Sequence, residues 1–142
     1  MTVRVERTFD LEATPEEVWN LISDPERRAR PISVVEDFEV TGDRTATWHI
    51  SLPIPVVRRT IAIETEDIEL DPPNYVKFVG RSKVMRVVGE HRIEAHESGS
   101  RVVNRFTVEG RVPGVERFFE RNLDRELRNL ETAFRREMDE RE

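Results

Sequence analysis

The most restrictive feature of this sequence is a change in the spacing of its apolar residues near residue 110. Between residues 33 and 110, apolar side chains recur at every second position, which is typical of β-strands with one buried face. From about Pro113 the spacing becomes three and four residues, which indicates a helix with one apolar face. The pattern predicts an antiparallel sheet and a long helix that cover each other's apolar faces. The apolar face of the helix comprises Val115, Phe119, Leu123, Leu127, Leu130, Phe134 and Met138.

The N-terminal residues add one strand and two short helices. Residues 3–11 alternate as a strand does, and "TPEEVWNLI" at 14–22 follows. A threonine N-cap, a proline at the first helical position and a glutamate that completes a capping box predict a helix there. "DPERRARP" at 24–31 repeats the pattern. We therefore predict an α+β fold in a single domain, residues 1–142, in which a curved antiparallel sheet of about seven strands wraps a long C-terminal helix.

The predicted strand at residues 56–70 contains a change of phase. Ile61 and Ile63 occupy odd positions, whereas Ile68 and Leu70 occupy even ones. A regular strand would place the two pairs on opposite faces of the sheet. We therefore predict a β-bulge near residues 65–67 that turns all four side chains toward the helix.

The composition argues against several classes of function. The formal net charge is -6 and both signs are spread along the chain, so we expect neither nucleic-acid binding nor membrane insertion. The chain has no cysteine, which excludes thiolate metal sites and cysteine nucleophiles, and a reducing cytoplasm is the simplest location. The HExxH, GxSxG, P-loop and GxGxxG motifs are absent from the sequence. We predict no catalytic residue, no metal and no cofactor.

Four stretches carry a resemblance to a known family: "ATPEEVWNLISDPER" at 13–27, "DPPNYVKFVG" at 71–80, "GSRVVNRFTVEG" at 99–110 and "VPGVERFFERNLDRELRNL" at 112–130. With the order of elements, they resemble the START-like (SRPBCC) superfamily, in the branch of polyketide cyclases/dehydrases and proteins like the G subunit of carbon monoxide dehydrogenase. The resemblance implies a helix-grip fold whose cavity, between sheet and long helix, takes apolar molecules such as lipids, quinones or polyketides. It transfers no catalytic residue. Members of the second kind are expected to work with a dehydrogenase and its quinone, and no residue here identifies such a partner.

Asn104 interrupts the apolar face of the last strand, and a buried asparagine needs hydrogen-bond partners. If Ser98–Gly99 forms the preceding turn, Asn104 lies opposite Ile93 and diagonal to His91, with Cα atoms about 7–8 Å apart. One water or one polar ligand atom would bridge that gap. The space beside Gly89, in the same inward column, would let a ligand approach closely.

His91 and Asn104 are thus candidates to orient the polar head of a ligand whose body lies against apolar side chains. The predicted ligand-binding residues are Trp48, Ile61, Ile63, Phe78, Val87, His91, Asn104, Phe106, Phe119 and Leu123. The apolar loop at residues 53–57 is a candidate mouth of the cavity, and Arg58 and Arg59 are a candidate clamp for an anionic head group.

Several interpretations stay open. The first is binding and carriage or presentation of a hydrophobic small molecule. The second is a cyclase or dehydratase in which His91 and Asn104 polarise a carbonyl. The third is a protein-interaction module, as in co-chaperone members of the superfamily, with an unidentified protein partner. For the pair itself, the alternative to ligand contact is a core pair bonded to each other, to the Trp48 indole or to a buried water.

Overall fold

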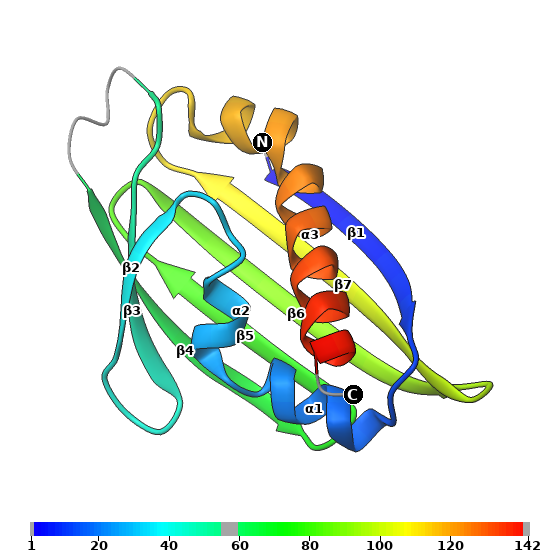
Figure 1. The fold of residues 1–142 in the computed structure, drawn as a ribbon. Helices are drawn as coiled ribbons and strands as arrows, with labels where there is room; N and C mark the ends of the chain where they lie inside the picture. The colour runs from blue at the N-terminus through cyan, green and yellow to red at the C-terminus, as the bar shows by residue number, and fades with distance from the viewer. Residues whose placement is uncertain (1, 55–59, 141–142) are drawn as a thin grey trace.

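The computed structural model describes residues 2–54 and 60–140 and contains the predicted elements in the predicted order (Figure 1). Its strands form one antiparallel sheet in the order β1-β7-β6-β5-β4-β3-β2. The sheet curves around the long helix, which confirms the predicted helix-grip fold (Figure 1). The elements are β1 (Thr2–Leu11), α1 (Pro15–Ile22), α2 (Pro25–Ala29), β2 (Val35–Val40), β3 (Thr45–Ile50), β4 (Ile61–Asp71), β5 (Tyr75–Arg81), β6 (Met85–His96), β7 (Gly99–Gly110) and α3 (Val115–Glu140).

The two short helices begin at the predicted caps. The Thr14 hydroxyl accepts a hydrogen bond from the Glu17 backbone N–H, and the Glu17 carboxylate accepts one from the Thr14 N–H. The Asp24 carboxylate accepts from the Glu26 N–H at the start of α2. These bonds satisfy N–H groups that have no partner within the helix. The chain can therefore leave β1, cover one end of the sheet with α1 and α2, and return to it as β2 (Figure 1).

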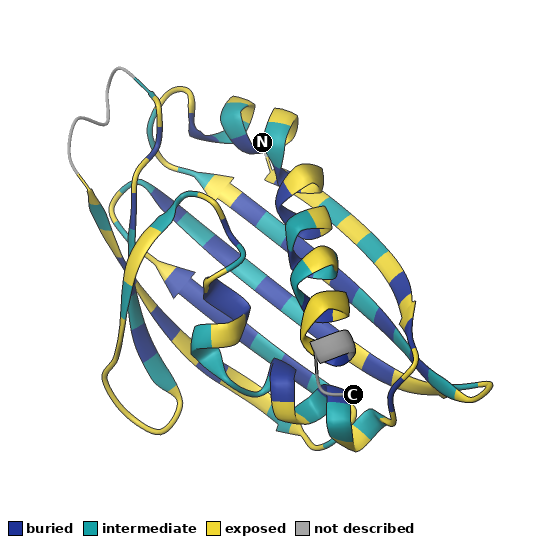
Figure 2. Ribbon diagram, viewed as in Figure 1, coloured by how far each residue is buried: buried dark blue, intermediate teal, exposed yellow. Residues whose placement is uncertain are grey.

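The core lies between the sheet and α3. Buried and more exposed residues alternate along most of the strands, so the sheet turns one face inward (Figure 2). All seven residues of the predicted apolar helix face are buried, at about 1.5–3 kcal/mol for each fully buried large side chain. The ion pairs Asp124–Arg128 and Glu131–Arg135, each joining residues four apart, lie on the other side of α3, with N–O distances of 3.4 and 2.9 Å. Packing against the sheet, more than the intrinsic propensity of α3, holds the helix in place.

The register of β6 and β7 differs from the predicted one by two residues. His96 pairs with Gly99, so the turn is Glu97–Ser98, and His91 lies directly opposite Asn104 rather than diagonal to it. Glu97 takes the left-handed conformation, with φ of 52°. Gly99 lies outside the turn and allows β1 to approach β7 closely, because a Cβ at this position would lie 2.2 Å from the Leu11 carbonyl oxygen. A two-residue shift preserves the face of every side chain, so the inward column survives except at its end, where Ala95 is exposed.

The bulge in β4 exists, but one consequence predicted from it is wrong. The pairing with β5 shifts between Asp67 and Glu69, just beyond the predicted position. Thr65 and Asp67 continue the inward phase, Ile68 is 42% exposed, and Leu70 packs against the core. Ile68 therefore does not face the helix. Asp67 takes the inward position because it forms a buried ion pair, described below, that the apolar pattern does not reveal.

Candidate ligand-binding site

An apolar cavity lies between the inward face of the sheet, α3 and the segment that joins α2 to β2. Its volume is about 30 Å³, which is room for about one water molecule, whereas ligand sites usually measure about 300–1,000 Å³. The walls must therefore move apart before a ligand can enter. Among the described residues, the lining consists of apolar side chains and the side chain of Glu126, whose carboxylate oxygens lie against Ser33.

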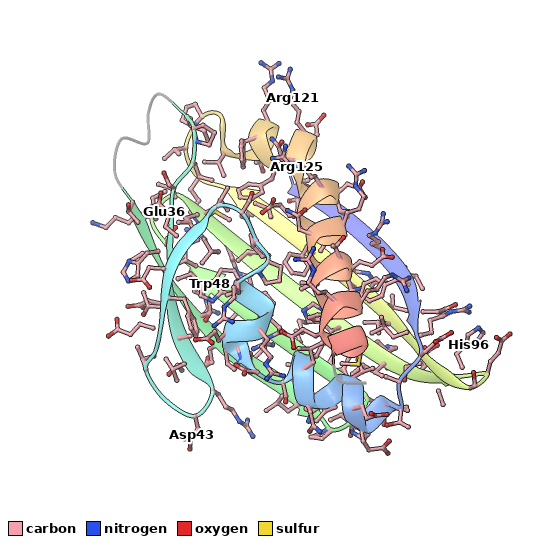
Figure 3. All side chains as sticks on the ribbon, viewed as in Figure 1. Glu36, Asp43, Trp48, His96, Arg121 and Arg125 are labelled. Atoms are coloured by element: carbon pink, nitrogen blue, oxygen red, sulfur yellow. The ribbon has the colours of Figure 1, made fainter. Side chains whose placement is uncertain are left out.

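Six of the ten predicted ligand-binding residues line this cavity: Trp48, Ile63, Val87, Phe106, Phe119 and Leu123. Trp48, on β3, is labelled in Figure 3. Phe78, His91 and Asn104 are buried but do not line the cavity, and Ile61 is half-buried against the core. The pair predicted to orient the polar head of a ligand, Asn104 and His91, thus does not lie on the wall of this cavity. The role of the ten residues in binding stays a prediction.

Glu126 joins α3 to the segment before β2. Its carboxylate is buried and accepts hydrogen bonds from the Ser33 backbone N–H and hydroxyl, each at 2.7 Å, and from the Asn129 amide at 3.3 Å. These donors replace the hydrogen bonds to water that the carboxylate loses on burial. Because Glu126 lies on α3 and Ser33 on the facing segment, the contact connects two walls of the cavity.

Asn104 makes all its hydrogen bonds within the protein. Its amide nitrogen donates to the Arg7 carbonyl of β1 at 3.0 Å, with a longer contact to the Val102 carbonyl at 3.5 Å. Its amide oxygen therefore faces His91, and lies 2.7 Å from Nδ1. This orientation makes Nδ1 the protonated nitrogen of His91. The asparagine thus bridges β1, β7 and β6 inside the core.

His91 is held neutral. Burial lowers its pKa to about 4, with a further contribution from the positive charge of Arg28, although the Asn104 bond opposes the shift. The Nε2 atom then carries a lone pair and has no hydrogen-bond partner in the described structure. Near neutral pH, Nε2 is therefore a hydrogen-bond acceptor that is sealed from the solvent.

A buried ion pair connects α2 to the sheet. One terminal nitrogen of Arg28, Nη2, donates to both oxygens of Asp67, at 2.9 and 3.1 Å, and both side chains are more than nine-tenths buried. The guanidinium also lies over the Phe78 ring, 5.2 Å from its centre. Pairing and ring contact compensate for part of the cost of removing these charges from water.

Unpartnered polar atoms gather around the Phe78 ring. Among the described residues, they are Arg28 Nε and Nη1, Trp48 Nε1 and His91 Nε2. The Trp48 and His91 rings lie 5.5 and 6.3 Å from the centre of Phe78. Phe78 itself covers Gly89, where a Cβ would lie 2.2 Å from a ring carbon. The space predicted beside Gly89 for a ligand is therefore filled by Phe78.

Sequence reasoning missed Arg28, Asp67 and Glu126, although two of them left a signal. Asp67 continues the odd-numbered inward phase of β4, and Glu126 lies on the helical spacing of the buried α3 stripe. A search for apolar periodicity treats a charged side chain at such a position as solvated or as a sign of a bulge. Arg28 left no comparable signal, because the five residues of α2 are too few to show a periodic buried face.

Several other features lie away from this site or outside the described residues. His96 is at the β6–β7 hairpin, with its Nε2 3.0 Å from Arg101 Nη2 (Figure 3). The described residues contain no group of three or more side chains that could hold a metal. The end of the candidate mouth loop, from residue 55, and the clamp formed by Arg58 and Arg59 lie outside the described residues. No helix in the described ranges is long and apolar enough to cross a membrane.

The fold and the cavity define a helix-grip protein of the START (SRPBCC) superfamily. The chain belongs to the polyketide cyclase/dehydrase and lipid transport family, whose model matches residues 2–135. This confirms the predicted superfamily. No curated protein sequence matches the chain at a significant level.

Similar solved structures cover nearly the whole chain. An aromatase/cyclase from Streptomyces sp. R1128 superposes with a TM-score of 0.80 at 15% identity, covering 99% of this chain and 96% of that one. A START superfamily protein from Mycobacterium smegmatis gives 0.78 at 10% identity, covering 98% and 99%. A protein from Thermus thermophilus gives 0.68 at 25% identity, covering 94% and 97%. At 10–15% identity, the first two likenesses establish the fold and leave the ligand open.

Proposed function

We propose that this protein binds a hydrophobic small molecule between the sheet and α3 and carries or presents it. The observation that supports the proposal is the cavity, which is lined among the described residues by apolar side chains and by the side chain of Glu126. Aromatic side chains from the sheet and from α3, Trp48, Phe106 and Phe119, supply part of that wall. Membership of a family described by polyketide cyclisation and lipid transport supports a lipid or polyketide-like ligand.

Binding requires the cavity to grow. Ile32, Val34 and Val35 form the wall that faces α3, and the last two are only half-buried. The Ser33–Glu126 hydrogen bonds hold this wall to α3. We infer that a ligand enters by separating this wall, which ends at the first residue of β2, from α3. The rest of the sheet stays intact, because its strands are fixed by their ladders of backbone hydrogen bonds.

The test is titration with N-phenyl-1-naphthylamine, a neutral apolar probe whose fluorescence rises in apolar surroundings. Val87→Trp fills the cavity and should weaken probe binding by at least about tenfold, because the new ring occupies the ligand's space. Val40→Trp is the matched control, since Val40 lies on β2 with 58% of its surface exposed. Circular dichroism checks that both variants fold.

A second variant acts in the opposite direction. Leu123→Ala enlarges the cavity and should tighten probe binding, because an apolar void stays dry and accepts apolar molecules. Native mass spectrometry of the freshly purified protein then identifies the class of any bound molecule. Equal probe affinity in the wild type, Val87→Trp and Leu123→Ala would show that the probe binds elsewhere and would contradict the proposal.

The enzyme alternative is supported by the family description, which includes polyketide cyclases, and by the likeness to an aromatase/cyclase. A mechanism through His91 and Asn104 is disfavoured, because the Asn104 amide is committed to His91 and to the Arg7 carbonyl. Glu126 is a better placed titratable group, since it lines the cavity. Turnover of a polyketide-like substrate that is lost in Glu126→Gln would favour this alternative.

A further inference from the structure

Glu126 places a buried carboxylate beside the cavity, and no protein cation pairs with it in the described structure. Its side chain is 1% exposed, and no lysine, arginine or histidine nitrogen among the described residues lies within 4 Å of its oxygens. Its hydrogen-bond donors within the described ranges, on Ser33 and Asn129, are all neutral. Donors converging on both oxygens form the pattern of an ionised carboxylate. Buried charges in proteins are usually paired, so an unpaired one calls for an explanation.

The contrast with the other buried carboxylate is informative. Asp67 also lies inside the fold, and it is paired with Arg28 through two hydrogen bonds. The chain therefore supplies a cation where a buried carboxylate stands in the solid core. It supplies none, within the described residues, for the carboxylate of Glu126, whose side chain lines the cavity and whose oxygens lie against Ser33.

We propose that Glu126 binds the ammonium group of a lipophilic amine whose apolar body occupies the cavity. The inference rests on the proposed function and names its ligand class. An ammonium group brings both the missing positive charge and N–H donors, and it forms a charge-assisted hydrogen bond with the carboxylate. The apolar wall, which includes Leu123 and Phe119 one turn and two turns before Glu126 on α3, then receives the hydrocarbon part.

The geometry also indicates how the ammonium group gains access. Glu126 Oε1 accepts from the Ser33 hydroxyl, and Oε2 accepts from the Ser33 backbone N–H. The hydroxyl can rotate away and leave Oε1 to the ligand, whereas the backbone donor can stay on Oε2. Ligand binding and release of the Ser33 hydroxyl are thus the same event, which loosens the contact between the wall and α3.

The experiment compares three eight-carbon ligands that differ in their head group, octylamine, 1-octanol and octanoate, by calorimetric titration at pH 7. We expect octylammonium to bind at least about tenfold more tightly than the alcohol, and octanoate to bind most weakly. Glu126→Gln should bind the amine and the alcohol with about equal affinity, since the substitution keeps the shape of the site and removes the charge. Glu120→Gln, on the exposed face of α3, is the matched control and should keep the preference.

A second variant guards against a folding defect in Glu126→Gln. Ser33→Ala removes only the hydroxyl that the ammonium group replaces, so the amine should bind as tightly as to the wild type or more tightly. Equal binding of amine and alcohol by the wild type, or loss of amine binding in Ser33→Ala, would overturn the inference and leave the proposed function standing. If none of the three ligands binds, the proposed function fails and this inference fails with it.

Discussion

Replacing Asn104 by leucine tests whether this residue is part of the core network. Leucine has the same branched arrangement of heavy atoms but forms no hydrogen bonds. The change leaves the His91 Nδ1–H and the Arg7 carbonyl without their 2.7 and 3.0 Å partners. Asn104 and His91 are both 0% exposed, so water does not replace the lost bonds. At about 1–3 kcal/mol for each stranded group, we expect the free energy of unfolding to fall by about 2–6 kcal/mol.

The assay is urea denaturation followed by circular dichroism, with comparison of midpoints at a constant slope. Asn122→Leu is the matched control, because Asn122 is half-buried and its amide donates to the Phe118 carbonyl one turn earlier on the same helix. It should change the free energy of unfolding by less than about 0.5 kcal/mol. Affinity for N-phenyl-1-naphthylamine should be unchanged in the folded Asn104→Leu protein, since Asn104 does not line the cavity.

The double variant His91→Phe/Asn104→Leu sharpens the test. It removes both members of the pair, so only the Arg7 carbonyl loses a partner, and the new ring can pack between Phe78 and Phe106 as the imidazole does. The double variant should therefore be more stable than Asn104→Leu alone. The network interpretation would be refuted if Asn104→Leu lowered the free energy of unfolding by less than about 1 kcal/mol. It would also be refuted if the loss in the double variant equalled the sum of the losses in His91→Phe and Asn104→Leu measured singly.

Three further outcomes follow from the buried groups. The folded-state pKa of His91 lies near 4, below its ordinary value of 6.5, so the fold is stabilised by the neutral imidazole above pH 6.5 and loses that stabilisation as the pH falls from 6.5 to 4. Between pH 7 and pH 4, the free energy of unfolding measured in denaturant should therefore fall by about 3 kcal/mol more in the wild type than in His91→Phe/Asn104→Leu. Arg28→Met should lower the free energy of unfolding by about 3–5 kcal/mol, because it leaves the buried Asp67 without its partner. The double variant Arg28→Met/Asp67→Leu should regain part of that stability in denaturant titrations, and the absence of any gain would count against the pairing. Gly89→Ala should cost about 1–3 kcal/mol in thermal melts through its clash with Phe78, and a neutral result would contradict that packing.

The sequence predicted the arrangement of layers because hydrophobic periodicity is a local property of the chain. The alternation over the strands and the stripe on α3 specify which faces must be buried, and the caps at Thr14 and Asp24 specify where the short helices begin. Six of the ten predicted ligand-binding residues line the cavity for the same reason. Four of them are inward side chains of the sheet, which face α3 in any register that keeps their face, and Phe119 and Leu123 lie on the buried stripe of α3.

The pairing of polar groups was decided only by the tertiary structure. The turn at Glu97–Ser98, rather than at the glycine, follows from the close approach of β1 to Gly99, a contact between segments far apart in the sequence. Asp67 and Glu126 face inward because Arg28 and Ser33 reach them from the segment after β1. A periodic pattern records whether a position is buried, but the partner that makes a buried charge tolerable comes from another part of the chain, and only the folded structure brings the two together.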